Sequence, residues 1–259
     1  MKGCGGAPGA VQDYDEGATQ AHRPARRRPL LALLLLASLP TVGVVANWLA
    51  SRSEVAAAAM VGLAVWMLCK AGVMILPAVW HRKVDGGEFG WSPMPRVGRR
   101  RALAEAAGAG IAMAAVVLIA FRLSAGIIDQ EATSASLQAL GLDSWRIVAL
   151  ALFFWVFVNS IVEEYVYRWF VTSQALALSG DVKVAMLISA SVFALHHVVG
   201  LALVTGWQVA LVGGLGVWLG GLVFCWLYLR HDSIWPAWLA HAIVDVAVFG
   251  LVGWLALAY

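Results

Sequence analysis

Seven long apolar segments follow one another along the chain, and they constrain its fold more than any other feature. They occupy residues 30–50, 55–80, 103–121, 145–170, 184–199, 207–229 and 236–258. A helix needs roughly 20 predominantly apolar residues to cross a bilayer, and most of these segments approach or exceed that length. The sequence therefore predicts an all-α, polytopic transmembrane helical bundle of about seven spans.

The overall composition excludes a soluble fold. The 259 residues are 61% hydrophobic and only 13% charged, with a mean hydropathy of +0.80. Soluble domains are about 45–50% apolar and about 25% charged, so a soluble chain of this length could not bury so much apolar surface. The net charge of +3 forms no patch typical of nucleic-acid binding, and no nucleic-acid partner is expected. The three cysteines form no CxxC pair and no metal-ligand spacing. Cys69 and Cys225 are expected to be small apolar fillers, and Cys4 a free thiol in the tail.

The first 29 residues differ from the rest of the chain. They are polar, rich in Gly, Ala and Arg, and lack periodicity, which predicts a disordered basic tail. A basic flank before a Leu-rich run is also typical of a signal peptide. The length of the run and the spans that follow favour an uncleaved first span. We therefore divide the chain into the tail (1–29), N-terminal transmembrane helices (30–140) and a C-terminal transmembrane region (141–259).

The charges of two loops predict the orientation in the membrane. The loop at 81–101 carries six lysine and arginine residues, whereas the loop at 122–143 is acidic by comparison. The positive-inside rule places the basic loop and the N-terminal tail in the cytoplasm. We expect a multi-pass protein of the cell membrane, in contact with lipid, with its C-terminus outside.

Two features of the spans bear on packing and on transport. Gly216 and Gly220 form a GxxxG pair, which predicts a helix-packing face on the sixth span. The chain has no internal repeat, which argues against a transporter built from inverted repeats.

Groups of ionisable side chains lie inside three of the predicted spans. Each such side chain costs at least about 2.5–3.5 kcal/mol on insertion scales, so each is a candidate functional residue. They are Glu163, Glu164 and Arg168 in the fourth span, His196 and His197 in the fifth, and His241 and Asp245 in the seventh. Lys70 is a further cation in the second span, which we expect to snorkel or to pair with a neighbouring carboxylate.

Helical spacing places the two acidic residues of the fourth span on different faces of the helix. Glu164 and Arg168 are four residues apart and can form an ion pair along their own helix. Glu163 is rotated by about 100°, onto the face of Asn159, where it can serve another partner.

Helical spacing also assigns each histidine to a face of its helix. His197 shares a face with Phe193, and His241 shares one with Asp245, whereas His196 points off the His197 face and is expected to be a packing or interfacial residue. Measured from the predicted span ends, Glu163 and His241 lie about 10 Å and about 8 Å deep, but His197 lies about 20 Å deep. A tilted or later-starting fifth span would bring the three together.

The residue types suit hydrolysis. A glutamate can take a proton from water, and histidines can stabilise an oxyanion or donate to a leaving amine. The same groups could instead bind zinc, which accepts imidazole nitrogen and carboxylate oxygen. The HExxH motif of many zinc proteases is absent.

Three motifs in order resemble the CAAX protease and bacteriocin-processing (CPBP) family, which includes the type II CAAX prenyl endopeptidases. That family shows EExxxR, then FxxxH, then HxxxN or HxxxD on successive helices. The matching residues here are Glu163, Glu164, Arg168, Phe193, His197, His241 and Asp245. The segment 233–241 also looks like the family, and the resemblance covers roughly residues 145–250.

The resemblance implies roles for the motif residues. Glu163 would activate water with help from His197, and His241 with Asp245 would form the oxyanion side. Supporting residues would be Glu164, Arg168 and Phe193. Family members are described both as metalloproteases and as metal-free glutamate proteases. A divalent metal such as zinc, if used, would be bound by Glu163, His197 and His241.

The resulting hypothesis is an intramembrane endopeptidase of the CAAX prenyl protease type, acting on a membrane-associated or lipidated peptide. Two alternatives stay open. One is a non-enzymatic bacteriocin-immunity or scaffold protein of the same family. The other is a proton-coupled transporter, since intramembrane Glu, His and Asp also build proton relays.

Overall fold

The computed structural model describes residues 26–88, 90, 92–95 and 98–258, so most of the predicted tail lies outside the described residues. Within these ranges the chain is all-helical. Seven helices are long and apolar enough to cross a membrane, which confirms the predicted bundle of about seven spans. Six of them are the single helices α2 (Pro29–Ser51), α3 (Ala56–Lys83), α4 (Arg99–Leu123), α9 (Val182–Thr205), α10 (Trp207–His231) and α11 (Ile234–Ala258). A short helix, α5 (Gln130–Ala139), lies in the acidic loop.

The fourth span is a composite helix that runs from residue 145 to residue 179. Its segments are α6 (Trp145–Phe153), the π-helical η1 (Phe154–Asn159), α7 (Ser160–Glu163), the π-helical η2 (Glu164–Val171) and α8 (Thr172–Ser179). The predicted end at residue 170 was wrong by nine residues. The helix continues because Thr172 and Gln174 find buried partners, and it ends where Gly180 adopts a left-handed conformation with φ of 69°.

The corrected boundaries remove the disagreement in depth between Glu163 and His197. Helix α9 starts at Val182, after Asp181 accepts a hydrogen bond from the backbone N–H of Val184 as its N-cap. Glu163 lies about 24 Å along its helix from residue 179, and His197 lies about 22 Å from the start of α9. The two side chains therefore stand at similar levels.

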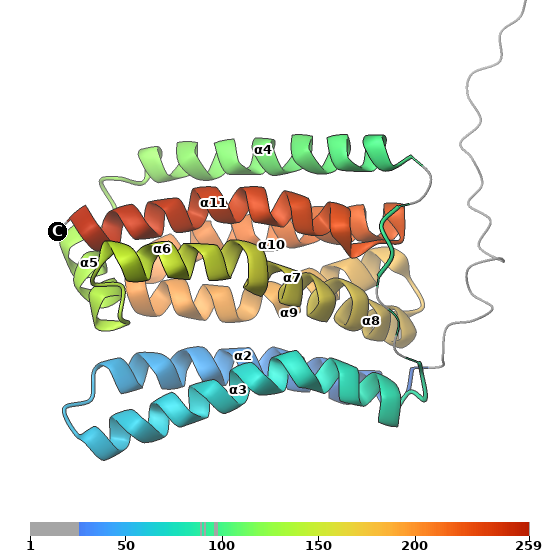
Figure 1. Cartoon of the computed structure of the whole chain (residues 1–259), viewed down its shortest axis with the longest axis horizontal. Coiled ribbons are helices and arrows are strands. Elements are labelled where there is room, and N and C mark those ends of the chain that lie inside the picture. The colour runs from blue at the N-terminus through green and yellow to red at the C-terminus, as the bar shows by residue number, and fades with distance from the viewer. Residues whose placement is uncertain (1–25, 89, 91, 96–97, 259) are drawn as a thin grey trace, which may run out of the picture.

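The helices lie roughly antiparallel in layers (Figure 1). The hairpin of α2 and α3 forms one side of the bundle, and α4 packs along α11 on the opposite side. The composite span and helices α9 and α10 lie between them, with α2 packed on α9 and α8. The central layer therefore contacts both outer layers and holds most of the candidate residues.

The glycines that allow close packing of α10 differ from the predicted pair. A Cβ atom at Gly216 would meet no described atom within 4 Å, and one at Gly220 would make only ordinary contacts. Gly214 and Gly221, seven residues apart, instead face α9, where a Cβ on Gly221 would come within 3.2 Å of Ala190. The GxxxG prediction was wrong because small residues recur along α10 and their spacing does not reveal which face meets a neighbour.

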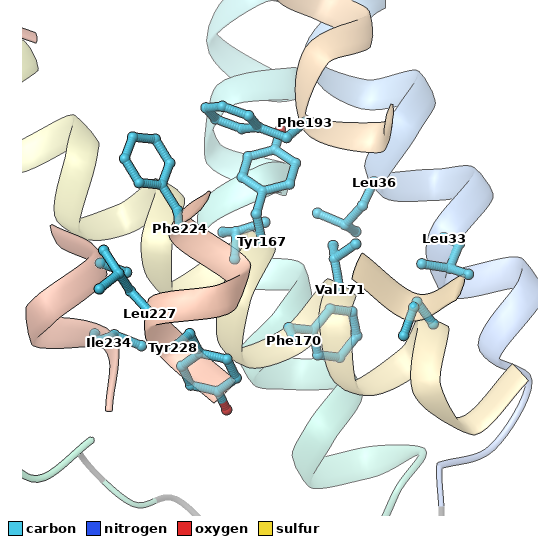
Figure 2. Close-up of a cluster of buried hydrophobic side chains, with 14 of the residues drawn as sticks. Leu33, Leu36, Tyr167, Phe170, Val171, Phe193, Phe224, Leu227, Tyr228 and Ile234 are labelled. Atoms are coloured by element: carbon cyan, nitrogen blue, oxygen red, sulfur yellow. The ribbon is translucent and has the colours of Figure 1, made fainter. Parts of the chain in front are cut away.

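The largest apolar core joins the α2–α3 hairpin to the rest of the bundle (Figure 2). Leu36 of α2 lies beside Val171 of η2, Leu33 and Phe170 belong to the same core, and all four are at most 5% exposed. The core thus fixes the N-terminal hairpin against the helix that carries the acidic residues.

A buried carboxylate fastens the same hairpin at one end of the bundle. Asp85, just after α3, accepts hydrogen bonds from the Arg26 guanidinium at 2.7 Å, the Arg27 backbone N–H at 2.9 Å and the Gln174 amide at 3.0 Å. The side chain of Asp85 is fully buried. This cluster joins the start of α2, the end of α3 and α8.

Candidate active site

Irregular helical turns carry the two neighbouring glutamates. Glu163 is the last residue of α7 and Glu164 the first of η2, so π-helical turns lie on both sides of this four-residue segment. The altered hydrogen bonding leaves the carbonyl of Tyr167 to accept from the hydroxyls of Thr172 and Ser189, both at 2.9 Å. Such π-helical turns occur frequently at functional sites.

The two oxygens of Glu163 have different surroundings. Oε1 accepts a hydrogen bond from the side-chain amide of Asn159 at 2.7 Å, which confirms that the two residues share a face. Oε2 lies 3.7 Å from Nε2 of His241. Glu163 is buried, so one oxygen is held in place while the other faces an imidazole.

Glu164 holds two neighbours at once. Its Oε2 lies 3.1 Å from Nε of Arg168, which confirms the predicted ion pair, and both side chains are fully buried. Its Oε1 lies 2.8 Å from Nδ1 of His241. Because an ionised carboxylate only accepts hydrogen bonds, Nδ1 is the donor in this contact. Glu164 therefore fixes the orientation of the His241 ring.

Two phenylalanines surround the guanidinium of Arg168. Its central carbon lies 4.5 Å from the ring centre of Phe193 and 5.1 Å from that of Phe224. The ring of Phe224 also stacks on His241 at 4.7 Å with an angle of 19°. Phe193 is the predicted supporting residue, whereas Phe224 on α10 belongs to no motif and was missed.

His241 lies among three carboxylates. Besides Glu163 and Glu164, Asp245 approaches it, with Oδ1 3.5 Å from Nε2, and the two residues share a face of α11 as predicted. Asp245 is 7% exposed. All the acidic residues of the motifs thus converge on one ring.

His197 stands on the other side of Glu163. Its Nδ1 lies 2.9 Å from the backbone carbonyl of Phe193, and since a carbonyl can only accept, Nδ1 carries the hydrogen. Nε2 is then left as the acceptor that can act as a base or a ligand. Phe193, one turn away, fixes the ring through its backbone as well as by packing.

His196 lies in this group, contrary to expectation. Ligand atoms of Glu163, His196 and His197 all fall within 4.8 Å of one another, so His196 is not a packing residue away from the site. Its ring also approaches Tyr167, with Nδ1 3.5 Å from the hydroxyl oxygen. The helical rotation between adjacent histidines still allows both rings to reach toward Glu163 from one side.

These three residues are of types that bind zinc. Two imidazoles and a carboxylate match the ligand set of many catalytic zinc sites, which keep a fourth position open. His196 replaces His241 in this set, because the atoms of His241 do not fall in the same group of the described residues. Glu163 and His197 are shared with the set that the resemblance implies.

A cavity of about 80 Å³ adjoins Glu163. Polar atoms of Lys70, Asn159, His196 and Tyr167 line it, together with apolar side chains of α2 and α3. A cavity of this size is large enough to hold water. The N-terminal hairpin therefore forms a wall of the site although it carries none of the motifs.

Lys70 contacts the site through Asn159. Its ammonium donates a hydrogen bond to Oδ1 of Asn159, whose amide holds Glu163. The expectation of a directly paired carboxylate was wrong, because an amide stands between the two charges. The sequence marked Lys70 as an intramembrane cation but gave no sign of its partner in another helix.

The comparisons with known proteins agree with the motifs. A family model described as type II CAAX prenyl endopeptidase Rce1-like matches residues 145–247. No curated protein and no solved structure matches the chain. The matched region begins with α6 and includes every motif residue. Residues 145–247 are therefore similar to the type II CAAX prenyl endopeptidase Rce1-like family, in agreement with the resemblance that the three motifs carry.

Proposed function

We propose that the protein is an intramembrane endopeptidase of the CAAX prenyl protease type that hydrolyses a peptide bond with a water molecule activated by Glu163. The observation that carries this proposal is the asymmetric environment of the Glu163 carboxylate. Asn159 holds Oε1 while Oε2 faces His241, and Glu163 lines a cavity with room for water. A carboxylate fixed in this way can take a proton without losing its position.

The reaction has two proton transfers. Glu163 takes a proton from water as the water oxygen forms a bond to the carbonyl carbon of the substrate, and the carbonyl oxygen becomes an oxyanion. The proton then passes to the amide nitrogen as the carbon–nitrogen bond breaks, which yields a carboxylic acid and an amine. His197, whose Nε2 is free to accept, orients the attacking water beside Glu163.

The oxyanion develops on the side of His241 and Asp245. When both ring nitrogens of His241 carry hydrogens, Nδ1 donates to Glu164 and Nε2 is left to donate to the oxyanion. Glu164 holds the His241 ring through Nδ1, and Arg168 in turn holds Glu164. A third residue orients the base in the same way in other hydrolytic sites. Asp245 limits the rotation of the ring from the other edge.

A bound zinc ion is an alternative way to activate water at the same place. The ligands would be Glu163, His196 and His197, and the ion would supply a Lewis acid that lowers the pKa of bound water. The proposal of a Glu163-centred site holds in both cases, because Glu163 is either the base or a ligand.

The family name suggests a prenylated peptide as substrate. A lipid-anchored peptide would reach a site inside the bilayer by lateral diffusion. We also propose that the basic end of the bundle, with the start of α2 and the loop after α3, faces the cytoplasm in the cell membrane.

Purified protein tests this function. Two peptides of identical sequence, one carrying an isoprenoid on its cysteine and one without it, are incubated with wild-type protein in detergent, and the products are identified by mass spectrometry. We expect cleavage of the prenylated peptide by the wild type and by Glu54→Gln, whose exposed carboxylate lies in the turn between α2 and α3. Glu163→Gln should lose about 10²–10⁴-fold in rate.

Two results would redirect the proposal. Equal cleavage by wild type and Glu163→Gln would contradict it. Binding of peptide without cleavage by either protein would favour the immunity or scaffold role. A chelator added to the wild type separates the two modes of water activation, because only the zinc-dependent mode loses activity.

A further inference from the structure

Lys70 lies in the middle of a span, outside the matched family region. It is about 20 Å from either end of α3, farther than a lysine side chain can reach, so it cannot snorkel to the membrane surface. Among the described residues no carboxylate forms an ion pair with its ammonium. An intramembrane charge of this kind is a candidate for function by default.

The contacts of Lys70 determine the orientation of Asn159. An ammonium group has donors only, so the atom of Asn159 that it contacts must be the oxygen Oδ1. The amide nitrogen Nδ2 then points away from Lys70 and donates to Oε1 of Glu163 at 2.7 Å. Without Lys70, the amide could turn over and present its oxygen to the carboxylate, where it could not donate.

Lys70 lies at the same cavity as the carboxylate that it positions. Lys70, Asn159 and Glu163 line this cavity, together with His196. Lys70 thus acts on the reaction through Asn159 and Glu163.

We propose that Lys70 is a positioning residue that fixes the general base, Glu163, through Asn159. The inference rests on the proposed function, since it assigns Lys70 a part in the work of Glu163. It gives the α2–α3 hairpin a role in catalysis, although α3 lies outside the region that the family model matches.

Three variants measure this role in the full-length protein. Lys70→Met keeps the length of the side chain and removes the charge, and Lys70→Arg restores a cation with donors only. Lys83→Met is the matched control, because it makes the same change at an exposed position of the same helix. Folded yield is measured by gel filtration in detergent, and Lys70→Met is expected to fold because it removes a charge from an apolar span.

We expect Lys70→Met to lower kcat by about 10–100-fold, since misplacement of a catalytic group has effects of this size. KM should change less than twofold, because Lys70 acts on the base and not on the substrate. Lys70→Arg should recover part of the lost kcat, and Lys83→Met should match the wild type. A rise in KM at constant kcat, or a wild-type kcat in Lys70→Met, would overturn the inference.

Combined variants separate this inference from the proposed function. Asn159→Ala breaks the same chain of contacts, so adding Lys70→Met to it should change kcat little further, whereas independent effects would multiply. If Lys70→Met does not fold, Asn159→Ala and Lys70→Arg decide alone, and wild-type kcat in Asn159→Ala overturns the inference. Full activity of Glu163→Gln would refute the proposed function, whereas an inactive Glu163→Gln beside a fully active Lys70→Met would refute the role of Lys70 only.

Discussion

Replacing Arg168 by methionine should destabilise the protein far more than an ordinary loss of charge. The guanidinium is fully buried, 3.1 Å from Glu164 and between two phenylalanine rings. Methionine fills a similar volume but leaves the Glu164 carboxylate without its cation. Breaking a buried ion pair from one side costs about 3–5 kcal/mol, because the remaining charge is uncompensated in a medium of low dielectric constant.

This cost predicts the behaviour of the double variant. Neutralising both members, as in Arg168→Met with Glu164→Gln, removes the uncompensated charge, so the double variant should be more stable than Arg168→Met alone. Both variants should lose activity, because Glu164 also holds the ring of His241. The double variant should therefore regain stability relative to Arg168→Met without regaining activity.

The chain supplies its own probe and control for this measurement. Cys69 and Cys225 are buried free thiols, so a thiol-reactive dye reports unfolding once Cys4 is replaced by serine. A loss of 3–5 kcal/mol corresponds to a decrease in Tm of roughly 6–20 °C for a chain of this size. Arg101→Met is the matched control, since Arg101 forms an ion pair with the same i,i+4 spacing but is 72% exposed.

Removal of the exposed pair should cost about 0.3–0.5 kcal/mol and leave Tm nearly unchanged. Equal Tm values for Arg168→Met and Arg101→Met would refute the reasoning. So would a double variant less stable than Arg168→Met, because it would show that the Glu164 charge is stabilised without Arg168.

Two further predictions concern Asp245 and the orientation of the bundle. Asp245→Asn should keep much of the cleavage activity and Asp245→Ala should lose it, because both Asp and Asn offer an acceptor oxygen close to Nε2 of His241. Equal losses in the two variants would indicate that the negative charge itself is needed. In a protein with Cys4 replaced, a cysteine at exposed Lys83 should react with a membrane-impermeant reagent only from the cytoplasmic side, and a cysteine at exposed Glu131 only from outside. The reverse pattern would invert the topology.

The fold class could be predicted because apolarity alone determines which segments enter a bilayer. The ends of the spans could not, as the composite fourth span illustrates. Thr172 and Gln174 read as polar residues beyond a membrane segment, yet they are buried. Their partners, Ser189 on α9 and Asp85 after α3, come from distant parts of the chain.

The same distinction explains which parts of the candidate site could be predicted. The contacts of Glu163 with Asn159 and of Glu164 with Arg168 join residues four apart, so helical spacing was enough to predict them. Motif order and the family resemblance added His197, His241 and Asp245.

The contacts that were missed join the site to other helices. Lys70 reaches it from α3 and Phe224 from α10, and neither is in a fixed sequence relation to the motifs. His196 was assigned to packing because adjacent residues are about 100° apart on a helix. The assignment failed because an imidazole is long enough to reach Glu163 from that position.

The most direct test of the central claim is the kcat of purified Glu163→Gln on a prenylated peptide, measured beside wild-type protein of equal folded yield. The substitution keeps the size of the side chain and removes its capacity to take a proton. The account predicts a fall in kcat of at least about 10²-fold with little change in KM. A kcat within twofold of the wild-type value would show that Glu163 neither activates water nor binds a required metal, and would contradict the account.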